Sequence, residues 1–413
     1  MRSEEREVVV VGGGPAGSAC ASFLARSGRD VLLLDAARFP RDKVCGESVS
    51  PGAWQVLHEL GAAEALRALD PRPIRGMRLR SPDGTSFAGR YPTTTVSGFG
   101  IRRLALDAAL LDVARRAGAE VRQGVRVLSP LPGGIRPGAQ IEGAWPSGAA
   151  VGGVLAETPE GPLAVRARLV IAADGRHSRV ARKLGLLAEP SRHRRFAVRG
   201  HFAGVEGLGD AGEMHVASGG YCGVAPLPDG LANVAIVLAP EALAAAAGDL
   251  PGFFLRTLRG LPELGERLAR ARLLAPPRAI GPLAVETRRP WAPGALLVGD
   301  AAGFYDPFTG EGVTLALRGA RDAAEVALAA LAAPSGPRDL RAYEARRHAQ
   351  TRDKFRVNRL LQRLIAHPAL ADLAARRLAA KPCLADRLVG IAGDLVPAGE
   401  ALGPRFLWDL LTA

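Results

Sequence analysis

Apolar residues follow two different patterns along this 413-residue chain. Four short stretches are almost continuously apolar, at 8–11, 31–34, 167–173 and 294–298. Such runs are typical of parallel strands that are buried on both faces. Two longer segments, 70–98 and 194–245, instead alternate apolar and polar residues between turn residues, as antiparallel strands do. We therefore expect an α/β protein with one parallel and one antiparallel sheet.

A glycine-rich turn follows the first apolar run. The sequence VVVVGGGPAG places Gly12, Gly14 and Gly17 at the spacing GxGxxG, and a helical stretch follows directly. Between a strand and a helix, these glycines allow a tight turn, the approach of a pyrophosphate and close helix–strand packing. The second strand ends at Asp35, at about the 20-residue distance where a carboxylate binds a ribose hydroxyl. This context predicts a dinucleotide site rather than a turn without a ligand. The carboxylate excludes NADP and leaves FAD and NAD.

Two later strands also end at a carboxylate. ARLVIAADG ends at Asp174 and Gly175, and GALLVGDAAGFYDPFTGEG places Gly299 and Asp300 before a glycine-rich loop and a long helix. Open α/β sheets bind ligands at the carboxyl ends of their strands. Capping of the next helix is the simpler role for Asp300. It does not explain the DPFTGEG loop, whose glycines let the backbone lie against a flat ligand.

The motifs VGGGPAG, ADG and GDAAGFYDPFTGEG, in this order, resemble those of flavoproteins with the para-hydroxybenzoate hydroxylase-type fold. This superfamily includes single-component aromatic monooxygenases, geranylgeranyl reductases and flavin-dependent halogenases. The resemblance spans about residues 5–330. It implies a Rossmann-like FAD-binding domain with an interleaved antiparallel-sheet substrate domain and a helical C-terminal tail. The implied resident cofactor is FAD.

The resemblance also implies roles for individual residues. Asp35 is expected to bind the adenosine ribose of FAD, and Asp300 the ribityl chain. Arg103, at the start of a helix, is expected near the cofactor, although an exposed helical arginine is the ordinary alternative. Val125, on the next strand, is expected near adenine, and Asp174 near the phosphates and a transiently bound pyridine nucleotide. The other residues expected at the cofactor are Gly299 and, along the isoalloxazine edge, Pro307, Gly310 and Gly312.

The polar segment FPRDKVCGE, at 39–47, resembles the one that runs beside the flavin in the reductase and halogenase branches. Arg41 and Lys43 are suited to attract a pyrophosphate or an incoming nicotinamide nucleotide. Cys45 and Gly46 are expected against the ring, where glycine permits close approach. A thiol near cationic residues would be acidic enough to react. A small apolar filler beside the flavin is the other role open to Cys45.

The patterns divide the chain into three regions. They are an FAD-binding domain formed by 1–69, 99–190 and 276–334, a substrate sheet formed by 70–98 and 191–275, and a helical tail at 335–413. Residues 129–153, rich in glycine and proline, predict a surface hairpin or loop. In the tail, 360–380 shows apolar residues at three-to-four spacing with arginines on the other face. We expect the tail to pack against the nucleotide domain; peripheral membrane contact is the alternative.

The segment GYCGVAPLPDG, at 220–230, departs from the halogenase branch. Halogenases carry WxWxIP here, whereas this chain has Tyr221, Gly223 and Pro226 at the corresponding positions and lacks both tryptophans. Its four lysines, Lys43, Lys183, Lys354 and Lys381, lie outside the expected substrate sheet. Geranylgeranyl reductases tend to have YxWxFP at these positions. Gly223 and Ala225 replace the two bulky residues here, which predicts a more open pocket above the flavin.

An FAD-dependent monooxygenase is the first functional hypothesis. NADH or NADPH would bind transiently and reduce the flavin, and one oxygen atom would pass to a hydrophobic, aromatic or polyketide-like small molecule. The rival is a reductase of carbon–carbon double bonds in an isoprenoid or polyene, with Cys45, Tyr221 and His215 as candidate proton donors. A halogenase and a non-catalytic flavin-binding redox sensor are the less favoured alternatives.

Composition narrows the choice of partners and location. The formal charge is +13, but no basic block is interleaved with aromatic residues, so no nucleic-acid partner is expected. The four cysteines are scattered, which argues against a zinc site or a disulfide framework. A strand begins within ten residues of the initiator, and no uncharged apolar run reaches the roughly 18 residues of a membrane span. We therefore expect a cytoplasmic protein.

Overall fold

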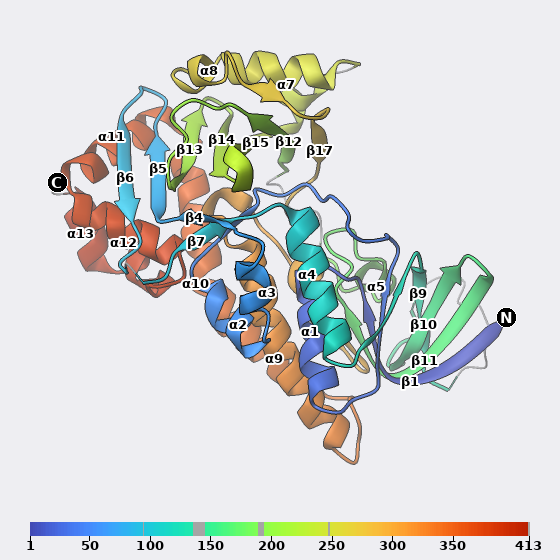
Figure 1. The fold of residues 1–413 in the computed structure, drawn as a ribbon. Coiled ribbons are helices and arrows are strands. Elements are labelled where there is room, and N and C mark those ends of the chain that lie inside the picture. The colour runs from blue at the N-terminus through green and yellow to red at the C-terminus, as the bar shows by residue number, and fades with distance from the viewer. Residues whose placement is uncertain (94, 135–144, 189–193, 247, 412–413) are drawn as a thin grey trace.

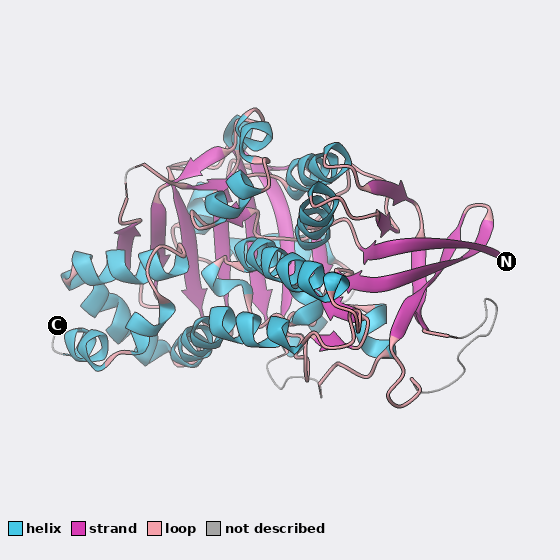
Figure 2. Cartoon of the chain, turned by 90° about the horizontal axis from the view of Figure 1, so that it is seen from below, coloured by secondary structure: helices cyan, strands magenta, loops and turns pink. Residues whose placement is uncertain are grey.

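The computed structural model describes residues 1–93, 95–134, 145–188, 194–246 and 248–411. Two large sheets and a three-stranded sheet form its framework, and helices pack against them (Figure 1). The tip of the expected hairpin, 135–144, lies outside the described residues. The chain begins at one end of the molecule and ends at the opposite one, as both views show (Figure 2).

The first sheet contains the continuously apolar runs. Its strands are β1 (Arg2–Val11), β2 (Val31–Asp35), β8 (Glu120–Gln123), β9 (Arg126–Pro132), β10 (Val151–Thr158), β11 (Gly161–Ala172), β18 (Trp291–Ala292) and β19 (Ala295–Leu297). The order is β18-β19-β11-β1-β2-β8, and the strands from β19 to β8 are parallel. Val8 to Val11 are buried because both faces are covered. β9 and β10 extend β11 as an antiparallel hairpin.

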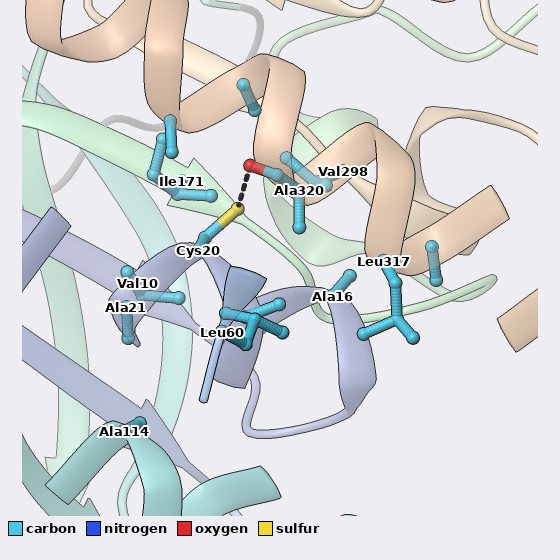
Figure 3. Packing of buried hydrophobic residues seen from close by; sticks show 14 of the residues in the cluster. Val10, Ala16, Cys20, Ala21, Leu60, Ala114, Ile171, Val298, Leu317 and Ala320 are labelled. Atoms are coloured by element: carbon cyan, nitrogen blue, oxygen red, sulfur yellow. Dashed lines mark hydrogen bonds between the residues drawn. The ribbon is translucent and has the colours of Figure 1, made fainter. Parts of the chain in front are cut away.

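Three helices, α1 (Pro15–Arg26), α4 (Arg103–Arg116) and α9 (Gly312–Ala332), cover one face of this sheet. Small residues let α1 and α9 approach closely, and the Cys20 thiol donates to the Ala320 carbonyl at 3.5 Å (Figure 3). Burial raises the pKa of the Cys20 thiol, as expected for an inert buried cysteine.

The second sheet joins strands from both alternating segments. Its strands are β5 (Gly76–Arg80), β6 (Ser86–Arg90), β12 (Phe196–Ala203), β13 (Ala211–Ala217), β14 (Gly220–Pro226), β15 (Leu231–Leu238), β16 (Arg272–Leu273) and β17 (Arg278–Ile280). The order is β16-β12-β15-β14-β13-β5-β6, and β17 also pairs with β12. The sheet thus extends past the expected boundary at 275. Helices α7 (Leu250–Arg259) and α8 (Leu264–Arg267) pack on its outer face through Phe254, Leu258 and Leu264.

The C-terminal helices are α10 (Arg341–Ile365), α11 (Pro368–Ala380), α12 (Pro382–Ala392) and α13 (Pro404–Leu411). We expected them against the nucleotide domain, and α10 does contact α9. However, α11 and α12 pack on β6, at the edge of the second sheet (Figure 1). Their apolar faces join Phe87 of β6 in one buried cluster. No helix in the described part of the chain is long and apolar enough to cross a membrane.

The remaining elements are short. They are β3 (Ser48–Val49), β4 (Arg72–Ile74) and β7 (Gly98–Gly100), which form the small sheet, and α2 (Ala53–Glu59), α3 (Ala63–Arg67), α5 (Arg179–Lys183), α6 (Pro240–Ala244), η1 (Pro228–Gly230), η2 (Gly299–Ala302), η3 (Pro307–Thr309) and η4 (Ala398–Leu402).

Candidate functional site

A cavity lies where the carboxyl ends of the first sheet face the second sheet. Its walls include the β1–α1 turn, the segment 43–50 and the loops that follow β11 and β19. Strands β13 to β15 and the helices α10 and α12 close the other side. This position is the one that open α/β sheets use for ligands.

The cavity gathers many of the residues that the motifs predict. Those that line it are Gly14, Lys43, Cys45, Gly46, Arg103, Tyr221, Gly299, Asp300, Pro307, Gly310 and Gly312. Those that do not line it are Gly12, Gly17, Asp35, Arg41, Val125, Asp174 and His215. The motifs that are far apart in the sequence therefore meet around one space.

The glycine turn has the geometry that its spacing predicts. Gly12 has a φ of +101°, a conformation that L side chains rarely adopt. A Cβ on Gly17 would lie 1.8 Å from the Gly12 carbonyl oxygen, so only glycine lets α1 start this close to β1. The Asp35 carboxylate accepts hydrogen bonds from the Gly13 amide at 2.6 Å and the Ala37 amide at 2.7 Å. The end of β2 thereby fixes the turn.

Val125 and Asp174 lie near the turn but outside the cavity. We expected Val125 on a strand, but it lies between β8 and β9. It is buried, and its amide donates to the Asp35 carbonyl at 2.9 Å. Asp174 accepts from the Arg179 amide at 2.8 Å, and burial raises the pKa of its carboxyl group. Asp174 thus holds the start of α5 in place.

One end of the cavity is strongly basic. Arg103 is buried and makes a bidentate pair with Asp107, at 2.7 Å for both contacts, so it is not the exposed helical arginine of the ordinary alternative. Arg41 joins the same carboxylate at 2.9 Å. Burial, together with the charges of Arg103 and Arg41, lowers the pKa of Lys43. An anion at this end would favour the charged form of Lys43.

The residues fit FAD. Gly46 and Gly310 have open space where a Cβ would point, and Gly14 meets only the tip of Arg41 at 3.7 Å. These three glycines line the cavity and form a cradle that a flat ligand can enter. Lys43, Arg103 and the turn at Gly14 would hold the pyrophosphate, and Asp300 would hold the ribityl chain.

The segment 42–47 is polar because it is tied to the second sheet. Arg199 donates to the Asp42 carboxylate at 2.7 Å and to the Lys43 carbonyl at 3.2 Å. The buried Glu47 carboxylate accepts from the Arg103 amide at 2.8 Å and from Asn233 at 2.9 Å. His201 Nε2 lies 2.6 Å from the same carboxylate. Since these partners come from β12, β15 and α4, Glu47 holds Cys45 and Gly46 at the cavity wall.

Two of the three candidate proton donors lie at the cavity. Cys45 lines it, and its sulfur accepts a hydrogen bond from the Glu47 amide at 3.4 Å. The Tyr221 hydroxyl donates to Asp306 Oδ1 at 2.5 Å. Burial, with the nearby Asp306 carboxylate, raises the pKa of Tyr221 well above its ordinary value. Tyr221 therefore holds its proton tightly.

His215 is the candidate that the structure removes from the site. It pairs across the strands with Cys222, and directly opposed residues share a face of the sheet. Cys222 packs in the cluster under α7, on the outer face. His215 lies 3.0 Å from Glu213, which in turn accepts two hydrogen bonds from Arg267. His215 belongs to this buried ionic group and does not reach the cavity.

A buried ion cluster lies at the opposite wall. Lys354 of α10 forms an ion pair with Glu311, the glutamate of the DPFTGEG loop, and lies 2.7 Å from Asp394. Lys354 and Glu311 line the cavity. Arg318 reaches Asp394 at 2.5 Å. Although burial opposes it, the carboxylates raise the pKa of Lys354. The cluster joins the DPFTGEG loop to the C-terminal helices.

The similarity to known proteins agrees with this site. A family model described as an FAD binding domain matches residues 5–205. The menaquinone reductase of Mycobacterium tuberculosis is 32% identical over 338 residues, covering 78% of this chain and 76% of that protein. A digeranylgeranylglycerophospholipid reductase of Methanopyrus kandleri is 33% identical over 379 residues, covering 89% and 93%. The chain belongs to the FAD-dependent oxidoreductases of the para-hydroxybenzoate hydroxylase type.

Solved structures show the same fold over nearly the whole of this flavoprotein. A flavin-dependent brominase superposes with a TM-score of 0.79 at 20% identity, covering 94% of each chain. A geranylgeranyl bacteriochlorophyll reductase-like protein from Thermoplasma acidophilum superposes with a TM-score of 0.67 at 23% identity, covering 99% of this chain and 96% of that chain. At these identities the likeness concerns the fold alone.

Sequence reasoning on this flavoprotein did not single out Glu47 or the Lys354 cluster. Glu47 adjoins Cys45 and Gly46 in CGE, and its φ of 56° is unusual for a non-glycine residue. A carboxylate directly after Cys45 and Gly46, which are expected against the ring, was the available signal. For Lys354 no such signal was present, because a helix with many basic residues is usually solvated.

Proposed function

We propose that this flavoprotein reduces carbon–carbon double bonds in an isoprenoid chain. The observation that carries the proposal is the apolar wall of the cavity beyond the flavin cradle. Met77, Leu79 and Met214 of the second sheet and Val357 and Leu361 of α10 line this space. Leu388 and Ile391 of α12 continue the same wall. Such a lining suits a flexible hydrocarbon better than a polar ring.

The relatives support the same substrate class. The two curated relatives described above are named as reductases of menaquinone and of a digeranylgeranylglycerophospholipid, and both of these molecules carry isoprenoid chains. The second likeness covers 89% of this chain. These relatives reverse the order of preference from the sequence, where the monooxygenase stood first. NADH or NADPH as transient reductant stays a prediction.

Reduction of a double bond needs a hydride at one carbon and a proton at the other. Bound FAD, once reduced by a pyridine nucleotide, would supply the hydride. The protein must position the isoprenoid substrate, exclude water and deliver the proton. Cys45 is the proton donor that we propose, since it lines the cavity beside the glycine cradle while Tyr221 holds its proton. Its thiolate would then recover a proton from solvent.

The proposal is tested by supplying the FAD-loaded enzyme and NADPH with geranylgeranyl diphosphate or menaquinone, without oxygen. Mass spectrometry should show the gain of one H₂ for each double bond reduced. Turnover that requires oxygen and adds an oxygen atom would instead support the monooxygenase. Enzyme whose FAD is reduced by neither NADH nor NADPH would contradict both as the reductant.

Cys45→Ser is expected to lower kcat for double-bond reduction at least about tenfold, because a hydroxyl is a far weaker acid than a thiol. FAD content and the rate of flavin reduction by NADPH should stay unchanged. Stopped-flow absorbance separates this reduction step from turnover. Cys383→Ser serves as the matched control, because Cys383 is an exposed cysteine. Full activity of Cys45→Ser would return Cys45 to the role of a small filler.

Peripheral membrane contact through the C-terminal helices stays a proposal. Large apolar side chains are exposed in this region, at Leu360, Leu370, Leu373, Leu395 and Trp408. A Leu370→Glu, Leu373→Glu variant is expected to sediment less with phosphatidylglycerol vesicles than the wild type, since both side chains come from α11. Leu69→Glu is the control, because Leu69 is also exposed but lies outside the tail. Equal sedimentation of the variant and the wild type would contradict this contact.

A further inference from the structure

A second cleft, of about 570 Å³, lies beside the flavin cavity. It is bounded by the segment 285–290, by the loop 302–305 that follows Asp300, and by one face of α10. Phe304 lines both the cleft and the flavin cavity, so its ring forms part of the wall between them. The motifs and the proposed function leave this cleft without a role.

Helix α10 presents a different face to each space. Lys354, Val357 and Leu361 line the flavin cavity. Arg352, Arg356 and Arg359, which follow each other at spacings of four and three residues, line the cleft. This spacing places side chains on one face of a helix. The two sides of α10 thus separate an apolar space from a basic one.

The cleft is strongly cationic. Six arginines line it, against two glutamates, and His348 lies among them. Arg352 and Arg356 share the Asp353 carboxylate, at 3.1 Å and 3.3 Å. Within the described part of the chain, Arg288 and Arg359 form no salt bridge. Much of this charge is therefore not neutralised within the cleft.

Three of the six guanidinium groups are held by neighbouring groups. Arg359 lies over the Tyr305 ring at 5.4 Å, and Arg289 lies over the Trp291 ring at 5.1 Å. Stacking of this kind leaves the N–H edge of a guanidinium available to a further partner. The buried Arg347 donates to the Ala302 and Gly303 carbonyls at 2.9 Å and 3.1 Å. That arginine fixes the loop 302–305 as the floor of the cleft.

We propose that this cleft binds the phosphate groups of a ligand that reaches the neighbouring flavin site. Arginine forks match phosphate oxygens in pairs, and several preoriented guanidinium groups in one concavity are what a diphosphate or phosphate ester requires. A pyridine dinucleotide and a prenyl diphosphate both carry such groups. The site does not depend on which reaction the flavin carries out.

The test uses FAD-saturated protein, so that the glycine turn is already filled, and follows binding by calorimetry. The probes are inorganic pyrophosphate, 2′,5′-ADP and geranylgeranyl diphosphate. The double variant Arg288→Gln, Arg359→Gln is expected to bind pyrophosphate at least about tenfold more weakly than the wild type, since charge-assisted hydrogen bonds are lost. Arg270→Gln should bind it as the wild type does, because Arg270 is highly exposed and does not line the cleft.

The three probes distinguish the sources of phosphate. If 2′,5′-ADP binds more tightly than pyrophosphate and loses affinity in the double variant, a pyridine nucleotide is the source. If geranylgeranyl diphosphate does so, the source is a lipid diphosphate. A loss for pyrophosphate alone still supports a phosphate site. Absence of binding to the wild type, or equal binding of all three probes to both proteins, overturns the proposal. Since binding needs no turnover, this result is separate from that of the activity assay.

Discussion

Lys354→Met is expected to lower the free energy of unfolding by about 3–5 kcal/mol, the usual cost of leaving a buried charge without its partner. Lys354, Glu311 and Asp394 are each less than a tenth exposed. Asp394 keeps its ion pair with Arg318 at 2.5 Å, so Glu311 is the carboxylate that loses its cationic partner. Urea unfolding followed by circular dichroism measures the change.

A second substitution and the pH dependence check the cause. Lys354→Met combined with Glu311→Gln should recover most of the stability, because no buried carboxylate is then left unpaired. Burial raises the pKa of Glu311 above its ordinary value of 4.5, and removal of Lys354 should raise it further. Folded protein then binds a proton that unfolded protein does not, so stability of the single variant should rise as pH falls from 7 toward 4.5.

Lys381→Met is the control for the loss of a lysine outside the cluster. Its ammonium donates to the Asp409 carbonyl at 2.9 Å, and we expect its loss to cost about 1 kcal/mol. An unfolding midpoint of Lys354→Met equal to that of the wild type would show that the cluster contributes little.

Gly46→Val is expected to give a folded protein that purifies without its yellow cofactor. No atom lies within 4 Å of a Cβ built at Gly46, and its φ is not among the positive ones, so the protein itself can accept the side chain. The valine would occupy the space in which the isoalloxazine ring is expected. Overpacking costs up to about 3 kcal/mol even where neighbours can shift, which corresponds to FAD affinity lower by about 100-fold.

The absorbance of purified protein and FAD titration of the apoprotein measure this loss, and urea unfolding of the apoprotein should be unchanged. Gly209→Val is a matched control, because Gly209 also has open space at its Cβ position but lies outside the cavity. Full FAD occupancy in Gly46→Val would mean that the ring lies elsewhere.

Local motifs were enough to predict the fold class and eleven of the residues that line the cavity. The glycine spacing, Asp35 and the DPFTGEG loop could be recognised because the local backbone geometry of a nucleotide site requires particular residues at particular spacings. His215 was placed wrongly because the side on which a strand residue points depends on which face of the sheet is covered. A single residue of offset separates Met214, which lines the cavity, from His215.

The tail was harder to predict for a different reason. Its amphipathic spacing predicts helices but not their partner, since an apolar stripe packs on any apolar surface. Helix α10 is rich in arginine, and such helices are usually solvated, whereas its Lys354 and Arg347 are buried. Their burial depends on carboxylates and carbonyls from Glu311, Asp394 and Ala302, which only the tertiary structure brings to the helix.

The walls of the flavin cavity come from opposite ends of the chain. Gly14 belongs to the β1–α1 unit, whereas Leu388 and Ile391 of α12 are made much later. At synthesis rates of about 5–20 residues per second, tens of seconds pass between them. A cofactor that arrives on the nascent chain therefore meets a phosphate-binding turn without the apolar wall, and the ring can be enclosed only after α12 has been made.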